Sequence, residues 1–438
     1  MHTHRPHVLI IGGGFAGLNA AKALRRAPVR VTLVDRRNHH LFQPLLYQVA
    51  TAGLSAPDIA APIRQILAHQ DNATVLLGEV THIDADAREV TVDGESRLSY
   101  DYLVVAAGAV NHWFGNDDWA QHAPGLKSLD DALDIRRRIL LAFEAAEREQ
   151  DAVARREWLD FVIIGAGPTG VELAGSIVDI AQKTLARNFR NFDAADTRVT
   201  LIEGAGRVLP AYPEKLSAQA QAQLEHLGVT VLTGARVTDI SERGVALKDG
   251  TTLTARTVLW GAGVKASPLL ETLRTTERDR GGRAKVSADL SLPDHPEVFV
   301  VGDAAHVAQE DGTPVPGVAP AAMQMGTHAA GAIMRRMRGQ APEPFRYADK
   351  GSMATIGRKK AVADFGRVTF QGLTAWLLWM GVHVLFLIGF RNRLAVMMEW
   401  AYAYLAYHRS ARVILASDRA LPAIEEDDPI PLRREGSA

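Results

Sequence analysis

Two glycine-rich turns are the part of this chain best suited to chemistry, because each could hold the phosphates of a dinucleotide. The glycines are Gly12, Gly14 and Gly17 in IIGGGFAGL, and Gly165, Gly167 and Gly170 in IIGAGPTGV. In such a turn the first glycine makes the bend, the second admits a pyrophosphate, and the third lets helix and strand pack closely. The helix that follows presents unpaired N–H groups to the phosphates. One such turn is a weak signal, but two in similar contexts predict two dinucleotide sites.

Each turn is followed by a helix and then by a strand that ends in an acid. These acids are Asp35 and Glu203, and a carboxylate there accepts hydrogen bonds from ribose hydroxyls. The alternative interpretation is a solvated carboxylate at a strand end. Glu203 would repel a 2′-phosphate, and no arginine immediately follows it, which favours NADH over NADPH at the second turn.

The stretch VFVVGDAAH assigns the two ligands. Its Asp303 resembles the aspartate that binds the ribityl chain of FAD in flavoproteins with two dinucleotide domains, although a plain helix N-cap is the alternative. FAD is therefore expected at the first turn and NADH at the second. The FAD domain would comprise residues 1–125 and 290–345, with an NADH domain, residues 126–289, inserted between them.

The surrounding pattern predicts the elements that position these turns. Apolar strands alternate with helical segments, and three more strands run into small residues at 102–109, 257–264 and 297–306, which is typical of an α/β protein with parallel sheets. Residues 128–158 have helical spacing. Two regions with short alternating strands, at 75–92 and 231–250, predict β-meanders.

Composition excludes several kinds of chemistry. The 438 residues include no cysteine, which removes disulfides, thiol nucleophiles, zinc-thiolate sites and iron–sulfur clusters, and no metal site is predicted. The net charge of −1 makes nucleic acid an unexpected partner. The N-terminus shows no secretory signal, so a cytosolic catalytic body is expected.

Over nearly its whole length the chain resembles the type II, non-pumping NADH:quinone oxidoreductases. The resemblance rests on GGGFAGL, VTLVDRRNHHLFQPLLYQVATAGLS, GAGPTGVELAG, VLWGAGV, VVGDAAH and an apolar C-terminal segment. It implies two Rossmann-like domains, non-covalent FAD, and ping-pong transfer of electrons from NADH to ubiquinone or menaquinone. The remaining alternatives are a soluble NADH-dependent reductase of a ferredoxin-like carrier and a non-catalytic NADH-sensing flavoprotein.

The resemblance also implies roles for individual residues. Glu172 resembles a glutamate placed near the flavin and both substrates, and is expected to relay protons or tune charge; a helix-terminal acid is the alternative. Gln324 matches the second glutamine of a quinone motif whose first glutamine is replaced here by Pro320. Pro44 and Leu45 are expected to line the quinone approach or to pack in the core.

The expected cofactor contacts follow the motifs. For FAD they are Gly12, Gly14, Phe15, Ala16, Gly17, Asp35, Arg36, Val80, Ala107, Gly108, Gly302 and Asp303. For NADH they are Gly165, Gly167, Pro168, Thr169, Gly170, Glu172, Glu203, Gly261, Ala262 and Gly263.

The C-terminal part changes character. Residues 346–417 contain the apolar run LTAWLLWMGVHVLFLIGF at 373–390, and 418–438 read as a solvated tail. Basic residues flank the apolar run on both sides, against the positive-inside tendency for a span. A helical anchor lying in the membrane surface is therefore preferred over a transmembrane helix or a buried dimer interface. The resulting expectation is a peripheral protein on the cytoplasmic face of the inner membrane, with a homodimer implied by the family.

Overall fold

The computed structural model describes residues 5–186, 188–309, 312–406 and 411–414. The expected tail at 418–438 lies outside these residues. The chain divides into two compact units, each made of three segments. Unit 1 comprises residues 1–41, 60–110 and 264–350, and unit 2 comprises 42–59, 111–263 and 351–438.

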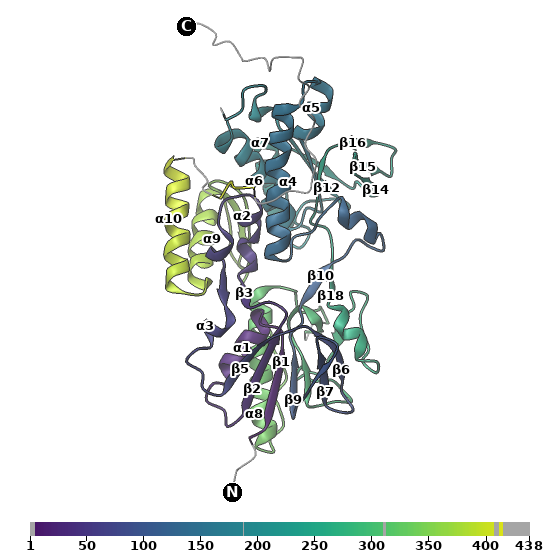
Figure 1. The fold of residues 1–438 in the computed structure, drawn as a ribbon, viewed down its shortest axis with the longest axis vertical. Coiled ribbons are helices and arrows are strands. Elements are labelled where there is room, and N and C mark those ends of the chain that lie inside the picture. The colour runs from purple at the N-terminus through teal and green to yellow at the C-terminus, as the bar shows by residue number, and fades with distance from the viewer. Residues whose placement is uncertain (1–4, 187, 310–311, 407–410, 415–438) are drawn as a thin grey trace. The chain divides into compact units, whose positions relative to one another are not determined.

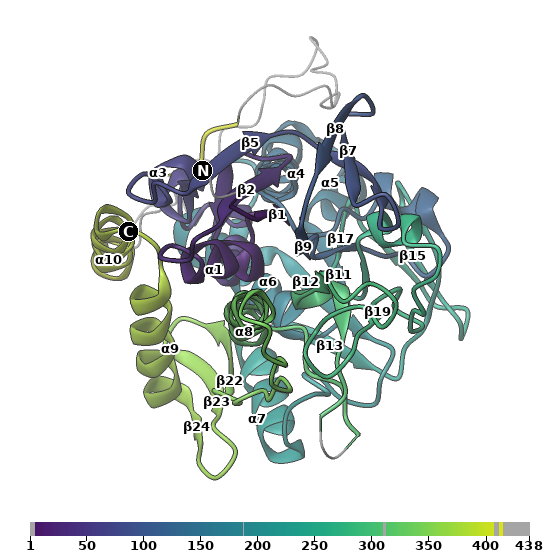
Figure 2. The ribbon, with the colours of Figure 1, turned by 90° about the horizontal axis from the view of Figure 1, so that it is seen from below.

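Unit 1 is built on a five-stranded parallel sheet with the order β20-β9-β1-β2-β5, of which β9, β1, β2 and β5 are labelled in Figure 1. Its strands are β1 (His7–Ile11), β2 (Arg30–Asp35), β5 (Ala73–Leu77), β9 (Tyr102–Val105) and β20 (Val298–Val300). Every residue of β1 is buried, as expected for a central strand covered on both faces. Helix α1 (Phe15–Ala23) packs along α8 (Ala319–Met337), as Figure 2 shows, and Gly326 permits this because a Cβ there would lie 2.0 Å from the carbonyl oxygen of Ala16.

Smaller elements complete unit 1. The predicted meander is present as the antiparallel strands β6 (Val80–Asp84), β7 (Glu89–Val92) and β8 (Ser96–Ser99). Strands β3 (His39–Leu41) and β4 (Ala60–Pro62) pair antiparallel, and a short helix α3 (Ile63–Ile66) follows. The chain leaves this unit in β10 (Ala109–Asn111) and re-enters it in β18 (Val264–Ala266).

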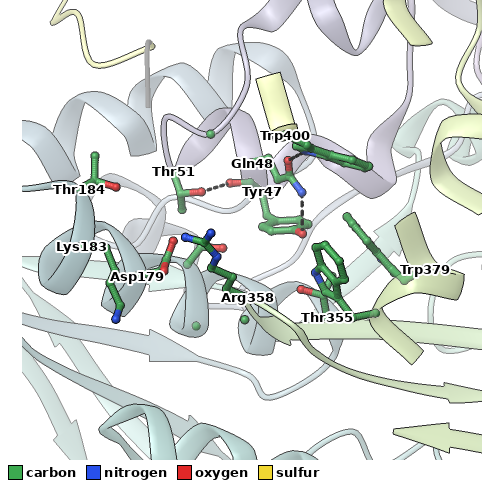
Figure 3. Close-up of a pocket in the computed structure, with 15 residues that line it drawn as sticks. Tyr47, Gln48, Thr51, Asp179, Lys183, Thr184, Thr355, Arg358, Trp379 and Trp400 are labelled. Carbon is green, nitrogen blue, oxygen red and sulfur yellow. Dashed lines mark hydrogen bonds between the residues drawn. The ribbon is translucent and has the colours of Figure 1, made fainter. Parts of the chain in front are cut away.

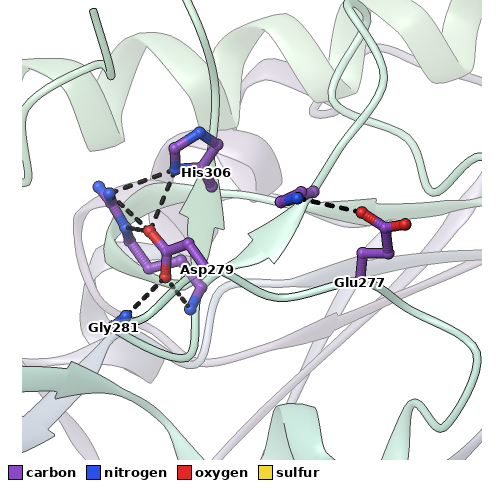
Figure 4. A network of polar contacts seen from close by, with 6 residues as sticks. Glu277, Asp279, Gly281 and His306 are labelled. Carbon is purple, nitrogen blue, oxygen red and sulfur yellow. Dashed lines mark hydrogen bonds and ion pairs between the residues drawn. The ribbon is translucent and has the colours of Figure 1, made fainter.

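A network of polar contacts supports the segment around Asp303. Strand β19 (Ala284–Lys285) pairs in parallel with β21 (Ala305–His306), and Asp279 holds the turn before β19 (Figure 4). Its carboxylate accepts from the backbone of Gly281 at 2.9 Å and from Arg283 Nε at 2.7 Å, and lies 3.1 Å from His306 Nδ1. This network fixes β21, the strand that begins two residues after Asp303.

Unit 2 contains a second parallel sheet, with the order β13-β12-β11-β17. Its strands are β11 (Asp160–Ile164), β12 (Arg198–Glu203), β13 (Val229–Thr233) and β17 (Thr257–Trp260). Helices α6 (Pro168–Asp179) and α7 (Glu214–Leu227) follow the first two of these strands in the chain. The second predicted meander is β14 (Val237–Ser241), β15 (Gly244–Leu247) and β16 (Thr252–Thr254). The predicted helical segment is two helices, α4 (Leu129–Arg148) and α5 (Ala152–Leu159), because Asp151 caps a new helix start.

The C-terminal part of unit 2 begins with an antiparallel sheet. It consists of β22 (Ser352–Gly357), β23 (Lys360–Asp364) and β24 (Thr369–Gln371), followed by helices α9 (Gly372–Phe386) and α10 (Phe390–Ala406). The apolar run is thus not one helix, since the backbone turns at Gly389 with φ +92°. Among the described residues, no helix combines the length and the apolar character that crossing a bilayer requires.

Candidate functional site

The first glycine turn has the geometry that a phosphate-binding turn requires. Gly12 has φ +97°, and a Cβ on it would lie 2.3 Å from the carbonyl oxygen of Ala106. A Cβ on Gly17 would lie 1.8 Å from the Gly12 oxygen, so α1 touches the turn at backbone distance. Gly14 is the N-cap of α1, has no side-chain cap, and has nothing within 4 Å of where its Cβ would be. The helix start therefore presents N–H groups beside open space, which suits an anion.

The second turn repeats this geometry in unit 2. Gly165 has φ +96°, and its Cβ would lie 2.5 Å from Ala262 Cα; a Cβ on Gly170 would lie 1.8 Å from the Gly165 oxygen. Gly167 caps α6 with nothing within 4 Å, and Pro168 occupies the first turn of the helix, where no N–H is needed. Because Gly261, Ala262 and Gly263 follow β17, next to β11 in the sheet, they border this turn.

The two acids at the strand ends, Asp35 and Glu203, stabilise the glycine turns by accepting hydrogen bonds from backbone N–H groups. One oxygen of Asp35 accepts from Gly13 N at 2.6 Å and the other from Arg37 N at 2.7 Å. Glu203 does the same, with Ala166 N at 2.7 Å and Ala205 N at 2.8 Å. The sequence motif did not reveal this supporting role, and ribose binding by these acids stays a prediction.

Most of the other predicted FAD contacts gather near the carboxyl edge of the unit 1 sheet. Ala107 and Gly108 follow β9, and Gly302 and Asp303 follow β20. Gly302 has φ +69°, and a Cβ on it would lie 3.3 Å from Ala16 Cβ. The exposed Arg36 lies 3.4 Å from Glu79, and Val80 begins β6 with its side chain buried.

Glu172 lies on α6 beyond its first turn, which weakens the interpretation as a helix-terminal acid. The residue keeps some exposed surface, but burial of its carboxyl group raises its pKa well above the usual 4.5, while a hydrogen bond from the backbone of Thr355 acts in the opposite direction. Thr355 belongs to β22, and α6 reaches this strand closely because a Cβ on Gly175 would lie 1.7 Å from the Ile356 oxygen. Burial, followed by the charges of Glu172 and Asp364, also raises the pKa of Tyr212. Glu172 is therefore a protonated acid over an unusually wide pH range.

This raised pKa predicts a pH-dependent stability. The folded state holds the proton of Glu172 above the pH at which the unfolded chain releases it, so unfolding becomes easier as pH rises from about 4.5 towards the folded pKa. Glu172→Gln removes that penalty while keeping an acceptor for Thr355. The variant should melt at a higher temperature than the parent protein at pH 8, and the gap should close as pH falls below 4.5. A gap that is constant between pH 4 and pH 8 would show that Glu172 is not the group responsible.

Unit 2 contains a cavity, shown in Figure 3, that is linked to Glu172 through Thr355. Thr355, whose backbone bonds to Glu172, lines it, and so do Gly175 and Ser176, one turn further along α6. Aromatic side chains supply much of the remaining wall. The lining residues are Tyr47, Gln48, Thr51, Gly53, Gly175, Ser176, Asp179, Lys183, Thr184, Thr355, Gly357, Arg358, Trp376, Trp379 and Trp400.

Gln48 connects the aromatic walls of this cavity. Its side chain accepts from Trp400 Nε1 at 2.8 Å and donates to the Tyr47 hydroxyl at 3.0 Å, as the dashed lines in Figure 3 show. Trp379 packs against Trp400 and His383, with ring centroids 5.4 and 4.3 Å apart. The sequence predicts Trp400 as a residue of the membrane–water interface, but its side chain is 6% exposed and lines this cavity; sequence reasoning assigned no separate role to Trp376 or Trp379.

The predicted quinone residues have different surroundings. In unit 2, Pro44 lies in a short 3₁₀ turn, Gln43–Leu45, and Leu45 is fully buried. In unit 1, Pro320 occupies the first turn of α8, as expected for a helix start. Gln324 Nε2 donates to the Ala348 carbonyl and its Oε1 accepts from the Ala348 N–H, both at 2.9 Å. Each polar atom of Gln324 thus has a partner in unit 1, while its amide has a second N–H and a second lone pair with which to make a further contact.

Comparison with known proteins places this geometry in a family. Residues 6–326 match the model for pyridine nucleotide-disulphide oxidoreductases, and residues 350–407 match the NDH2 C-terminal domain. The type II NADH:quinone oxidoreductase Ndh of Mycobacterium tuberculosis (strain ATCC 25618 / H37Rv) is 47% identical over 94% of this chain and 90% of its own length. The mitochondrial internal alternative NAD(P)H-ubiquinone oxidoreductase A1 of Arabidopsis thaliana is 30% identical over 90% and 83%.

Solved structures share the fold. The structure of NDH2 from Plasmodium falciparum in complex with NADH matches with a TM-score of 0.86 at 20% identity, covering 93% of this chain and all of that one. The sulfide:quinone oxidoreductase from Aquifex aeolicus matches with a TM-score of 0.71 at 18% identity, covering 92% of this chain and 95% of that one.

Proposed function

The chain belongs to the type II NADH:quinone oxidoreductases, and from that premise we propose that it oxidises NADH with a membrane quinone through FAD, without pumping protons. The observation that supports this best within the chain is the cavity whose wall residue Thr355 bonds to Glu172. Its aromatic surfaces suit a planar ring, and Thr355 connects it to Glu172, a carboxyl group whose pKa is raised by burial. Reduction of a quinone to a quinol requires both electrons and protons, and in this proposal Glu172 supplies one of the protons.

FAD fits the residues of unit 1. The uncapped start of α1 and the open space at Gly14 suit a pyrophosphate, and Gly302 and Asp303 lie at the same sheet edge. When bound, FAD accepts hydride equivalents from NADH and passes two electrons to the quinone. The residues of the chain bind and orient FAD and NADH. The Asp35 carboxylate fixes the first glycine turn, and the start of α6 receives the phosphates of NADH.

Quinone recognition involves Glu172 and the aromatic cavity in this proposal. Pro44 and Leu45 precede Tyr47 by three and two residues, and Gln324 contributes through its second amide N–H, in addition to its pair with Ala348. Apolar side chains on α9 and α10 are exposed, which suits contact with a lipid surface. They include Leu373, Leu377, Leu385, Phe386, Met397, Met398 and Tyr402. A peripheral position on the cytoplasmic face of the inner membrane, and a homodimer, complete the proposal.

The rival functions predict different behaviour. A soluble reductase of a ferredoxin-like carrier would not need the exposed apolar helices, and a non-catalytic sensor would not turn over. The test is to bleach the flavin of the intact protein with NADH without oxygen and then add a quinone. Rapid return of the flavin absorbance supports the proposal. If only a carrier protein restores the absorbance, or nothing does, the proposal fails.

Filling the cavity should slow reoxidation of the flavin by quinone without slowing its reduction by NADH. Ser176→Leu adds an apolar side chain to the cavity wall, so quinone reoxidation should slow about tenfold while reduction by NADH is unchanged. Ala222→Leu, on the exposed surface of α7, is the matched control and should alter neither half. Equal rates in Ser176→Leu and the parent protein, measured by stopped-flow absorbance, would exclude this cavity as the quinone site.

A further inference from the structure

Phe114 in unit 2 is an aromatic side chain that packing alone does not account for. It is 63% exposed, and its backbone has φ +52°, in the left-handed region that residues other than glycine rarely adopt. The next residue, Gly115, has φ +91°, and Asn116 N donates to the Trp113 carbonyl at 3.0 Å. Two central residues with positive φ are typical of a type I′ turn, where Asn, Asp or Gly is usual and phenylalanine is not. The turn displays an apolar ring in a strained conformation.

The ring is held against the carboxyl end of the sheet. A Cβ on Gly263 would lie 2.7 Å from Phe114 Cζ, so the tip of the ring lies against the backbone at Gly263. Trp260 and His112 support it, with ring centroids 5.8 and 5.4 Å away. These supports are themselves fixed, because Trp260 Nε1 donates to the His112 carbonyl at 3.1 Å and His112 N donates to the Gly263 carbonyl at 3.1 Å.

The strand order indicates which part of a dinucleotide would reach this ring. Glu203 ends β12 on one side of β11, and Gly263 follows β17 on the other side. A strand-end acid of this kind marks the adenosine ribose, and the turn after the central strand marks the pyrophosphate. The other half of the molecule, the nicotinamide, therefore extends towards β17 and Phe114.

We propose that Phe114 is a binding residue for NADH, with its exposed ring forming one wall for the nicotinamide half of the dinucleotide. This rests on the proposed function, since it needs NADH at the second turn. A flat aromatic wall orders a planar ring at low entropic cost, and the supports from Trp260 and His112 keep it in place before the ligand arrives. The contacts with Trp260 and His112 hold Phe114 in its strained conformation, and such strain is typical of a functional site.

Three substitutions in the intact, flavin-loaded protein test the proposal. Phe114→Gly removes the ring and also relieves the strain that a positive φ causes in other residues. Phe114→Ala removes the ring but keeps that strain, and Phe114→Tyr keeps the ring. The NADH concentration that half-saturates flavin reduction should rise about tenfold in the Gly and Ala variants and change by less than about twofold in the Tyr variant. The rate of flavin reoxidation by quinone should not change.

Two further readouts separate binding from structural support. Phe114→Gly should melt no lower than the parent protein, whereas a ring needed only for packing would lower its melting temperature. ADP-ribose, which lacks nicotinamide, should inhibit the parent and the Gly variant equally. The proposal is overturned if Phe114→Gly responds to NADH like the parent, or if its affinity for ADP-ribose falls as much as that for NADH. If the parent protein is not reduced by NADH at all, the proposed function itself fails.

Discussion

Replacing Glu172 with glutamine should slow reoxidation of the flavin by quinone about a hundredfold, the usual contribution of a positioned acid. Glutamine has nearly the same shape and can still accept from the Thr355 backbone, so the wall of the cavity should stay in place. It cannot release a proton to a reduced quinone. Reduction of the flavin by NADH requires no proton from this position and should change by less than about twofold.

Single-mixing stopped-flow measurements can follow the two halves separately. Glu214→Gln, on the exposed first turn of α7, removes a carboxylate elsewhere in unit 2 and should leave both rates unchanged. If Glu172→Gln also leaves both rates unchanged, Glu172 has no part in proton supply. If it slows reduction by NADH as much as reoxidation, the residue acts on the NADH side instead.

Replacing Gly165 or Gly167 with alanine should impair the second glycine turn in two different ways, the first by lowering stability and the second by weakening NADH binding. Gly165 combines φ +96° with a Cβ position 2.5 Å from the Ala262 backbone, so Gly165→Ala should destabilise the protein by roughly 3 kcal/mol. At Gly167, φ is −70° and nothing lies within 4 Å of the Cβ position. Gly167→Ala should therefore fold normally, yet place a methyl group where the pyrophosphate of NADH would lie. Its half-saturating NADH concentration should rise more than about tenfold.

Thermal melting and NADH-dependent flavin reduction distinguish these effects. Both variants should retain their flavin, because the residues expected to bind it belong to unit 1. Gly14→Ala in the first turn is the counterpart: it should fold, since Gly14 also faces open space, but it should lose flavin during purification. A Gly167→Ala protein with the parent's NADH dependence would mean that the second turn does not bind a phosphate.

Local features were predictable because their causes are local. A glycine turn needs positive φ and close backbone approach, and Gly12 and Gly165 have both. The meanders at β6–β8 and β14–β16 follow from alternation along short strands. The structure of the apolar run at 373–390 was harder to predict, because hydropathy does not show where a helix ends. The backbone turns at Gly389, so this part of the chain forms two helices, α9 and α10.

The sequence by itself determined the two dinucleotide turns, the parallel sheets and the exclusion of cysteine chemistry, since each depends on residue type and spacing within short segments. Only the tertiary structure decided what surrounds Glu172, because β22 approaches α6 from about 180 residues further along the chain, where Gly175 allows contact. It also decided that Trp400 closes a cavity by bonding to Gln48, 352 positions away, and that Gln324 is paired with Ala348. Such contacts depend on how buried surfaces pack, and no spacing along the chain encodes them.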